Sequence, residues 1–239
     1  MPKTYVEYNS FTMYRARYRR IIFFFARLLS SIIFWHLFLP RIGLKQLSLR
    51  NKTERLRKAA RDYRYLAVEM GGVLIKVGQF LSARVDVLPP EFTSELEGLQ
   101  DEVPAEDFSE IRMVAEKEFG MTLEEKFLEF NPQPLAAASL GQVHLAKVRG
   151  FSSPVHKPIE PSDSTQYNVV VKIQRPNIEK LIATDLAALK TVANWLNHYK
   201  PIRKRADVPQ LLQEFTLILY EEIDYLAEGR NAEAFSQNF

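Results

Sequence analysis

Three short β-rich segments set the limits on the fold of this chain. They lie between long stretches of helical periodicity and read as strands over Leu135–Ala138, Gln142–Arg149 and Asn168–Gln174. Alternating apolar and polar residues are typical of strands, whereas apolar residues three and four positions apart are typical of helices. The Ser-, Pro- and Gly-rich segment Gly150–Gln166 is predicted to be a hairpin loop between the last two strands. The sequence therefore predicts an α+β fold built on a small antiparallel sheet.

Helices are predicted on both sides of the strands. The expected helices are Asn51–Ala83 with a break at Gly71-Gly72, Val73–Arg84 beyond that break, Glu91–Leu99, Phe108–Phe119, Pro176–Tyr199 and Val208–Phe235. Gly120 is well placed to end the Phe108–Phe119 helix. Three strands followed by a helical region that carries acids is the element order of a protein-kinase N-lobe.

The first 50 residues form a basic arm around the most apolar stretch of the chain. The arm holds nine Lys and Arg residues and one acid, Glu7, while Ile21–Leu39 is close to the length of a membrane span. Arg27 interrupts this stretch, and a central Arg costs about 2.5–3.5 kcal/mol on insertion scales. We favour an interfacial helix over a true span. A helix that packs as core on the rest of the protein is the third interpretation.

Composition excludes several kinds of site. The 239 residues include no cysteine, and the four histidines show no metal-ligand spacing, so the sequence predicts no disulfide and no metal site. The net charge of +3 does not indicate a nucleic-acid partner.

A lysine at the end of the third strand is the first candidate site residue. Lys172 in VVVKIQ lies where a kinase places the lysine that contacts nucleotide phosphates. Such a lysine needs a carboxylate to hold its side chain, and Glu222 and Asp224 in EEIDY are the candidates. Taken alone, each motif is better explained as a strand end or a solvated helix face.

Small residues occupy the turn between the first two strands. Ala136, Ala137, Ala138 and Ser139 lie where kinases have a Gly-rich loop. Their backbone N–H groups and the Ser139 hydroxyl can face an anion, although the alanine Cβ atoms restrict the backbone. A tight turn packed by small side chains is the alternative.

A third candidate motif lies upstream on a predicted helix. Lys76 and Gln79 are three residues apart and share a face, and Gly78 between them permits close approach of another element. The alternative is an exposed polar face.

Taken together, these motifs resemble the UbiB/ADCK family of atypical kinases, with its ABC1-type kinase-like domain. KVGQFLSARVDVLP, PLAAASLGQVHLAKV, VVVKIQRP and EEIDYLAEGRNAEAF follow one another in that family's order, from about Asn51 to the end. The resemblance implies a membrane-associating helix over residues 1–50, a helical K-x-G-Q extension over 51–130, and a partial kinase-like N-lobe over 131–239, with the C-lobe absent.

The resemblance also implies roles for the candidate residues. Lys76, Gly78 and Gln79 belong to the extension that guards the nucleotide pocket, and Ala136–Ser139 replaces the glycine-rich loop. Glu222 is implied to be the partner of Lys172, and Asp224 is implied to be tied to the extension. The implied cofactors are ATP or ADP with Mg²⁺, and the implied chemistry is that of an ATPase or small-molecule kinase.

The sequence departs from the family pattern after these motifs. The catalytic loop and D-F-G should follow the E-x-D helix, and Asp107-Phe108-Ser109 only superficially resembles D-F-G because it precedes the strands. We expect no catalytic residue and no metal ligand in this sequence, and no turnover by it alone. The implied partners are a nucleotide, a membrane surface, and an isoprenoid-lipid substrate or quinone-biosynthesis proteins. The implied location is a membrane on the bacterial cytoplasmic side or in an organelle. A non-catalytic, membrane-associated helical binding module is the rival interpretation.

Overall fold

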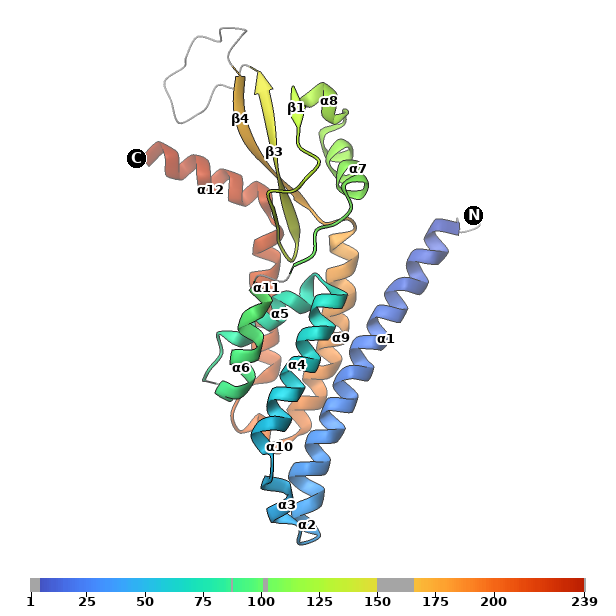
Figure 1. The fold of residues 1–239 in the computed structure, drawn as a ribbon, viewed down its shortest axis with the longest axis vertical. Helices are drawn as coiled ribbons and strands as arrows, with labels where there is room; N and C mark the ends of the chain where they lie inside the picture. The colour runs from blue at the N-terminus through green and yellow to red at the C-terminus, as the bar shows by residue number, and fades with distance from the viewer. Residues whose placement is uncertain (1–4, 87, 101–102, 150–165, 239) are drawn as a thin grey trace. The chain divides into compact units, whose positions relative to one another are not determined.

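The structure is a computed structural model that describes residues 5–86, 88–100, 103–149 and 166–238. One small antiparallel sheet is combined with helices before and after it, which confirms the predicted α+β class (Figure 1). The predicted hairpin loop lies outside the described residues, apart from Gln166, which begins a strand. The chain forms two compact units: a helical unit of Met1–Glu102 with Glu179–Leu217, and a sheet unit of Val103–Ile178 with Ile218–Phe239.

The helical unit begins with a long helix. Its elements are α1 Tyr5–Ile33, the π-helical turn η1 Phe34–Phe38, α2 Leu39–Arg41, α3 Lys45–Leu49, α4 Lys52–Met70, α5 Val73–Ser82, α6 Pro90–Leu96, the 3₁₀ turn η2 Glu97–Gln100, α9 Ile178–His198, α10 Lys200–Arg203 and the first part of α11 Val208–Ile223. The predicted break at Gly71-Gly72 is confirmed, because both glycines have positive φ angles of 64° and 61°. Glycine adopts this backbone region without the steric cost that other residues meet.

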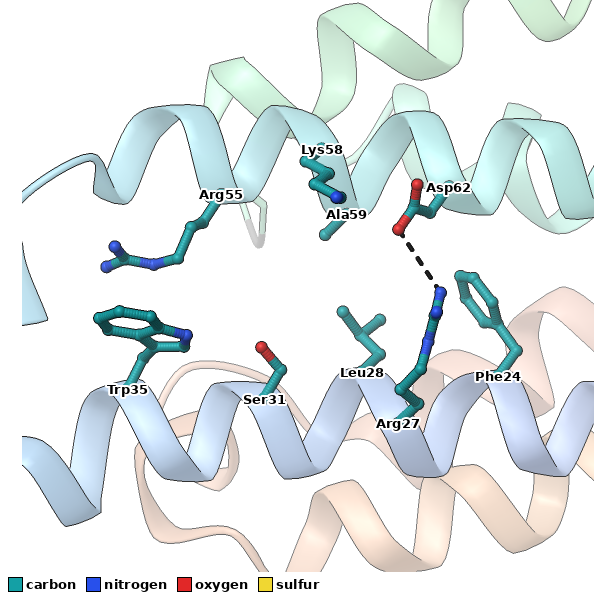
Figure 2. Close-up of a pocket in the computed structure, with 9 residues that line it drawn as sticks. All are labelled: Phe24, Arg27, Leu28, Ser31, Trp35, Arg55, Lys58, Ala59 and Asp62. Atoms are coloured by element: carbon teal, nitrogen blue, oxygen red, sulfur yellow. Dashed lines mark ion pairs between the residues drawn. The ribbon is translucent and has the colours of Figure 1, made fainter.

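α1 and α4 run antiparallel and are joined through α2 and α3 (Figure 1). Arg20 pairs with Glu69 between the two helices. Figure 2 shows two further contacts along them, the ion pair of Arg27 with Asp62 at 3.5 Å and Arg55 over the Trp35 ring at 4.2 Å. Among the α1 side chains whose burial the structure describes, from Thr12 onward, only Ile21 and Phe24 are buried. α1 therefore docks along one narrow side only.

A buried ion pair fixes α1 to α9. Both Nε and one terminal nitrogen of Arg17 donate to the two carboxylate oxygens of Asp185 at 2.6 Å. The other terminal nitrogen donates to the carbonyl of Met70 at 2.5 Å, at the end of α4 where carbonyls lack helical partners. Burial raises the pKa of Asp185, and the hydrogen bond and charge of Arg17 oppose that shift. One guanidinium thus joins three helices of the helical unit.

The sheet unit is organised around one central strand. Its strands are β1 Glu129–Phe130, β2 Ala136–Ala137, β3 Gly141–Arg149 and β4 Gln166–Gln174. β3 pairs antiparallel with β1, β2 and β4, and its register with β4 runs from Gly141 opposite Gln174 to Arg149 opposite Gln166. The prediction of three antiparallel strands is met, and the two-residue strand β1 was not predicted.

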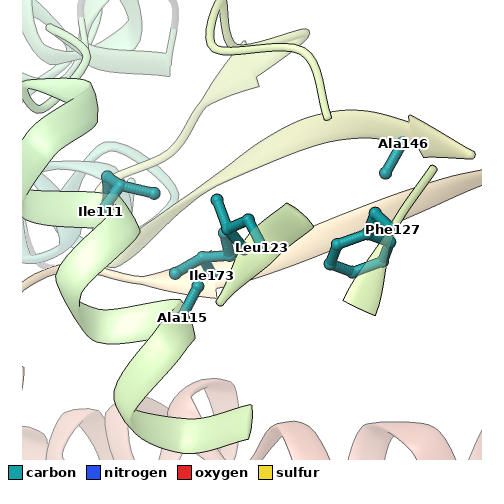
Figure 3. Close-up of a cluster of buried hydrophobic side chains, with 6 residues drawn as sticks. All are labelled: Ile111, Ala115, Leu123, Phe127, Ala146 and Ile173. Atoms are coloured by element: carbon teal, nitrogen blue, oxygen red, sulfur yellow. The ribbon is translucent and has the colours of Figure 1, made fainter. Parts of the chain in front are cut away.

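Helix α7 Phe108–Phe119 and helix α8 Leu123–Lys126 cover one face of the sheet. Figure 3 shows the core between them, formed by Ile111, Ala115, Leu123, Phe127, Ala146 and Ile173. Asp107 caps α7 by accepting the Ser109 N–H at 2.8 Å, and Gly120 ends the helix with a φ of 67°. The D-F-G-like triplet at Asp107 is therefore a helix start.

The predicted helix Val208–Phe235 is wrong in one respect, because it is two helices. α11 ends at Ile223, and α12 Tyr225–Asn238 begins after Asp224, whose carboxylate accepts the Ala227 N–H at 2.9 Å. An aspartate in this position satisfies a backbone donor that a new helix leaves unpaired.

The compact units are not continuous in sequence, and the predicted division at residues 50 and 130 stays a prediction. Helix α9 and most of α11 follow the sheet in sequence but pack with the helical unit, whereas α7 precedes the sheet and covers it. Chain order alone gives no signal for such exchanges.

Candidate functional site

The two faces of the sheet differ in character. Ile173 points into the core with α7, so Lys172, next to it in the strand, points to the opposite face. On that face Val143 lies opposite Lys172, and Leu145 lies opposite Val170. Leu145 and Val170 are 41% and 61% exposed. The face that carries Lys172 is therefore open, and its apolar side chains lie between Lys172 at one end and Lys147 at the other.

Lys172 has a carboxylate partner, but the partner is not the predicted one. Its ammonium lies 2.6 Å from Oε2 of Glu228 in α12, so the ion pair predicted for Glu222 is made by Glu228. The same ammonium lies 4.4 Å from the centre of the Tyr225 ring. The Lys172 and Glu228 side chains are 40% and 58% exposed, so this pair remains open to solvent. An exposed pair of this kind is easily rearranged.

Tyr225 and Glu222 lie beside the ion pair. Burial, and then the negative charges of Glu228 and Glu222, raise the pKa of Tyr225 to about 12, so its phenol is neutral near pH 7. Glu222 is thus close enough to influence the site electrostatically, although it is not the partner of Lys172. Gln174 donates to the Ile223 carbonyl at 2.5 Å, which ties the end of β4 to the end of α11.

Asp224 has a local role in the structure, because it caps α12 and so sets the direction of the helix that carries Glu228. Its predicted tie to the K-x-G-Q extension stays a prediction.

The alanine-rich segment forms a tight turn. The Ala138 N–H donates to the Gly141 carbonyl at 2.8 Å, and Ala136 and Ala137 pair with Val143 and Gln142. Ser139 is buried while Ala136 and Ala138 are exposed, so the Ser139 hydroxyl does not present itself on the surface. A Cβ added at Gly141 would lie 2.6 Å from the Ile173 carbonyl oxygen and would overlap the Tyr225 hydroxyl. Glycine is therefore required where the turn meets β4.

Arg175 holds this turn in place. Its backbone N–H donates to the Leu140 carbonyl at 3.0 Å, and its guanidinium donates to the carbonyls of Ala138 at 3.2 Å and Pro104 at 2.7 Å. The guanidinium also pairs with Glu106, and Arg175 is almost fully buried. One side chain thus joins the end of β4, the alanine-rich turn and the segment before α7.

The K-x-G-Q residues lie together on α5 in the helical unit, whereas the other candidate residues lie in the sheet unit. A Cβ added at Gly78 would overlap Leu99 Cδ1 and lie 3.2 Å from the Tyr63 ring, so the predicted close approach is confirmed. Gln79 donates to the Leu99 carbonyl at 3.2 Å, and Lys76 is half-buried. Gly78 and Gln79 therefore both fix α5 against η2.

Within the part of the chain that the structure describes, no three His, Cys, Asp or Glu side chains gather where they could hold a metal ion.

Sequence reasoning missed Glu228, Tyr225 and Arg175. Glu228 was within the quoted motif, and its position four residues after Asp224 would have indicated it once a helix start at Asp224 was considered. Arg175 carries no such signal, because the partners of its side chain lie 37 to 71 residues away in sequence.

Known proteins resemble this chain over most of its length. It is 39% identical over 186 residues to the uncharacterized protein sll1770 of Synechocystis, which aligns with 78% of the chain. It is 37% identical over 174 residues to the chloroplastic protein ACTIVITY OF BC1 COMPLEX KINASE 8 of Arabidopsis thaliana, over 72% of the chain. It is 34% identical over 205 residues to the probable protein kinase UbiB of Marinobacter nauticus, over 86% of the chain.

The chain spans only 29%, 21% and 32% of the lengths of these three relatives. A solved structure, the complex of Rv3197 with erythromycin from Mycobacterium tuberculosis, is 29% identical and covers 78% of this chain and 43% of its own, with a TM-score of 0.42. Residues 98–239, more than half of the chain, match the ABC1 atypical kinase-like domain. The chain therefore belongs to the family of ABC1 atypical kinase-like proteins that includes UbiB, as its motifs predicted.

Proposed function

We propose that the open face of the sheet binds ATP or ADP, and that the chain is the nucleotide-binding part of a UbiB-type kinase or ATPase. The observation that carries the proposal is the 2.6 Å ion pair between Lys172 in β4 and Glu228 in α12. A strand lysine paired with a helix glutamate is the arrangement with which protein kinases position the lysine that contacts nucleotide phosphates.

The phosphates would meet the Lys172 ammonium. A lysine has three N–H donors, and Glu228 takes one of them, which leaves donors for phosphate oxygens. The Tyr225 ring beneath the ammonium limits the directions that the side chain can take. Glu228 therefore holds the Lys172 side chain in place and leaves its remaining N–H groups to donate to phosphate oxygens.

The nucleobase would lie on the apolar part of the same face. Val143, Leu145 and Val170 are neighbours across β3 and β4, next to Lys172. Burying apolar surface of this kind contributes about 25 cal/mol per Å². Base and phosphates would thus be recognised side by side on two adjacent strands. Mg²⁺, which would accompany the nucleotide and balance phosphate charge, is assigned no ligand in this chain.

Binding of a fluorescent ADP analogue tests the proposal. Lys172→Met should weaken binding at least about tenfold, because a charge-assisted contact contributes roughly 1.5–3 kcal/mol. Glu228→Gln should weaken it less, because the lysine remains. Lys117→Met is the matched control, since Lys117 is an exposed cation of α7, which covers the opposite face of the sheet. Equal affinity for all four proteins would favour the rival interpretation of a non-catalytic binding module.

We also propose that residues 1–50 attach the chain to an anionic membrane surface. The helix Thr12–Arg41 is long and apolar enough to cross a bilayer, and only 6% of its most apolar window is buried. Exposed aromatic side chains such as Phe23, Phe34 and Phe38 beside basic residues suit an interfacial helix. One relative is named as chloroplastic and another is a bacterial protein, so both a bacterial and an organellar location fit the proposal.

Vesicle flotation tests this attachment. Phe23→Glu with Phe34→Glu should abolish flotation with anionic vesicles while the docked side of α1 stays intact. Met113→Glu, on an exposed apolar residue of α7, is the control.

A role in isoprenoid-quinone or other lipid metabolism is the extension of this proposal. Loss of quinone on disruption of the gene, restored by the wild-type sequence and not by Lys172→Met, would support that role.

A further inference from the structure

A pocket of about 320 Å³ lies between α1 and α4, outside the proposed nucleotide site. Figure 2 shows the side chains of the two helices pointing toward each other across it. A volume of this size is at the lower end of the range of small-molecule sites. Ser31 and Ala59 lie at its middle, where small side chains leave the space between the helices unfilled.

Two specific contacts close the ends of the pocket. Arg27 pairs with Asp62 at 3.5 Å at one end, and Arg55 lies 4.2 Å from the Trp35 ring at the other. Arg55 also donates to the carbonyls of Ser48 and Arg50, so its guanidinium is fixed in position. Specific contacts between the two helices therefore define both ends of this space.

The pocket carries an excess of positive charge. Arg27, Arg55 and Lys58 line it with a single acid, Asp62, and that acid is already paired with Arg27. Lys58 is exposed at the rim, and among the residues that the structure describes no carboxylate pairs with it. An anion entering the pocket would therefore meet an ammonium and a guanidinium whose charges are not balanced.

The pocket is continuous with an apolar surface of the same helix. Leu28 and Phe24 form its apolar wall. Phe23 and Phe34 directly precede Phe24 and Trp35, which line the pocket. They therefore lie about 100° round the helix from the pocket, and Phe23 is 72% exposed. A ligand with a phosphate in the pocket can therefore lay acyl chains along α1.

We infer that this pocket binds the phosphate headgroup of an anionic lipid. The inference rests on the proposed membrane attachment and names a headgroup site within it. The phosphate contacts Lys58 and Arg55, the glycerol lies over Ser31 and Ala59, and the chains follow the exposed aromatic side of α1.

A soluble lipid tests the site without a bilayer. The chain has two tryptophans, and Trp195→Phe leaves Trp35, which lines the pocket, as the reporter. Short-chain phosphatidic acid below its micelle concentration should shift Trp35 emission saturably, and inorganic phosphate at the same concentration should not. In this background Lys58→Glu should weaken binding roughly five- to tenfold, and Ser31→Phe should abolish it by filling the pocket.

Arg57→Glu is the matched control, because Arg57 is an exposed cation of α4 that does not line the pocket. Equal weakening by Lys58→Glu and Arg57→Glu would overturn the inference in favour of general surface charge. An unchanged affinity of Ser31→Phe would overturn it as well, once circular dichroism shows that the variant is folded. An equal response to inorganic phosphate would overturn the assignment to a lipid.

Vesicles separate this inference from the membrane proposal. If Lys58→Glu and Ser31→Phe still float with vesicles that contain phosphatidic acid but no longer bind the short-chain lipid, the pocket is a headgroup site and the aromatic side of α1 provides attachment. If wild-type protein does not float, the attachment proposal fails, and the Trp35 titration still decides whether the pocket binds the lipid.

Discussion

One ion pair in the helical unit and one in the sheet unit differ in burial and geometry. Arg17 and Asp185 in the helical unit are buried, bidentate and joined to backbone carbonyls. Lys172 and Glu228 in the sheet unit share one contact and remain about half exposed. Burial raises the pKa of Asp185, because removal from water disfavours the charged carboxylate. The hydrogen bond and the positive charge of Arg17 favour the charged carboxylate and oppose this shift. A pair of this kind is costly to break, whereas an exposed pair can exchange its partner for a ligand.

The largest expected effect is the loss of the buried pair. Asp185→Ala should lower the free energy of unfolding by about 3–5 kcal/mol, because it leaves a buried guanidinium without its carboxylate. Urea denaturation measures the change. The control is Glu69→Ala, which removes the exposed partner of Arg20 between α1 and α4 and should leave the midpoint nearly unchanged. The double variant Arg17→Met with Asp185→Leu should recover most of the loss, and a further loss would contradict this account.

The next effect concerns the clamp at the alanine-rich turn. Arg175→Met removes the donors to the Ala138 and Pro104 carbonyls, and should cost about 2–3 kcal/mol. Faster hydrogen exchange at the Ala138 amide would locate the loss at the turn. Arg175→Lys keeps the charge but not the planar fork, and should restore only part of the stability. Full recovery by lysine would show that charge alone fixes the turn.

Alanine substitutions of two helix glycines, one in each unit, compare how closely the helices of the two units are packed. Gly78→Ala should destabilise the protein by about 1–3 kcal/mol, since its Cβ would overlap the buried Leu99 side chain. Gly229→Ala in α12 has nothing within 4 Å of the added Cβ and should stabilise it by about 0.5–1 kcal/mol. Thermal denaturation of the two variants gives both signs. Equal shifts would mean that close packing at α5 is unimportant.

The smallest effect on stability is expected at the proposed nucleotide site. Lys172→Met should change the free energy of unfolding by less than about 1 kcal/mol, because its ion pair is half exposed. The same variant is expected to lose nucleotide binding. A loss of stability as large as that of Asp185→Ala would make Lys172 a structural residue and would remove the contrast between the two pairs.

Local signals predicted much of the secondary structure. The helix Phe108–Phe119 has the predicted limits, because Asp107 and Gly120 determine both ends within one turn. The breaks at Gly71 and Gly72 follow from the same kind of signal. The two-residue strand β1 has none, because its only reason to be extended is its pairing with Lys147 and Ala146.

The candidate site was predicted in part for a related reason. The motif containing Lys172 was identified, and strand alternation places Lys172 on the face away from Ile173. Glu222 is the partner that the family resemblance implies, and the sequence alone leaves Glu222 and Asp224 as candidates. The cap at Asp224 starts a new helix, and this presents Glu228 to Lys172 instead. The buried pair of Arg17 and Asp185 lies 168 residues apart in sequence, and neither residue carries a local signal.

That separation of 168 residues has a consequence for biosynthesis. At about 5–20 residues per second, a ribosome needs roughly 8 to 34 seconds after making Arg17 before it makes Asp185. During this interval α1 is a nascent apolar segment whose Arg17 lacks its carboxylate partner, because α9 does not yet exist. A membrane surface or a chaperone that engages the nascent chain early would protect it from aggregation. The positions of Arg17 and Asp185 in the sequence therefore determine the earliest time at which α1 can dock on α9, as well as the final contact between them.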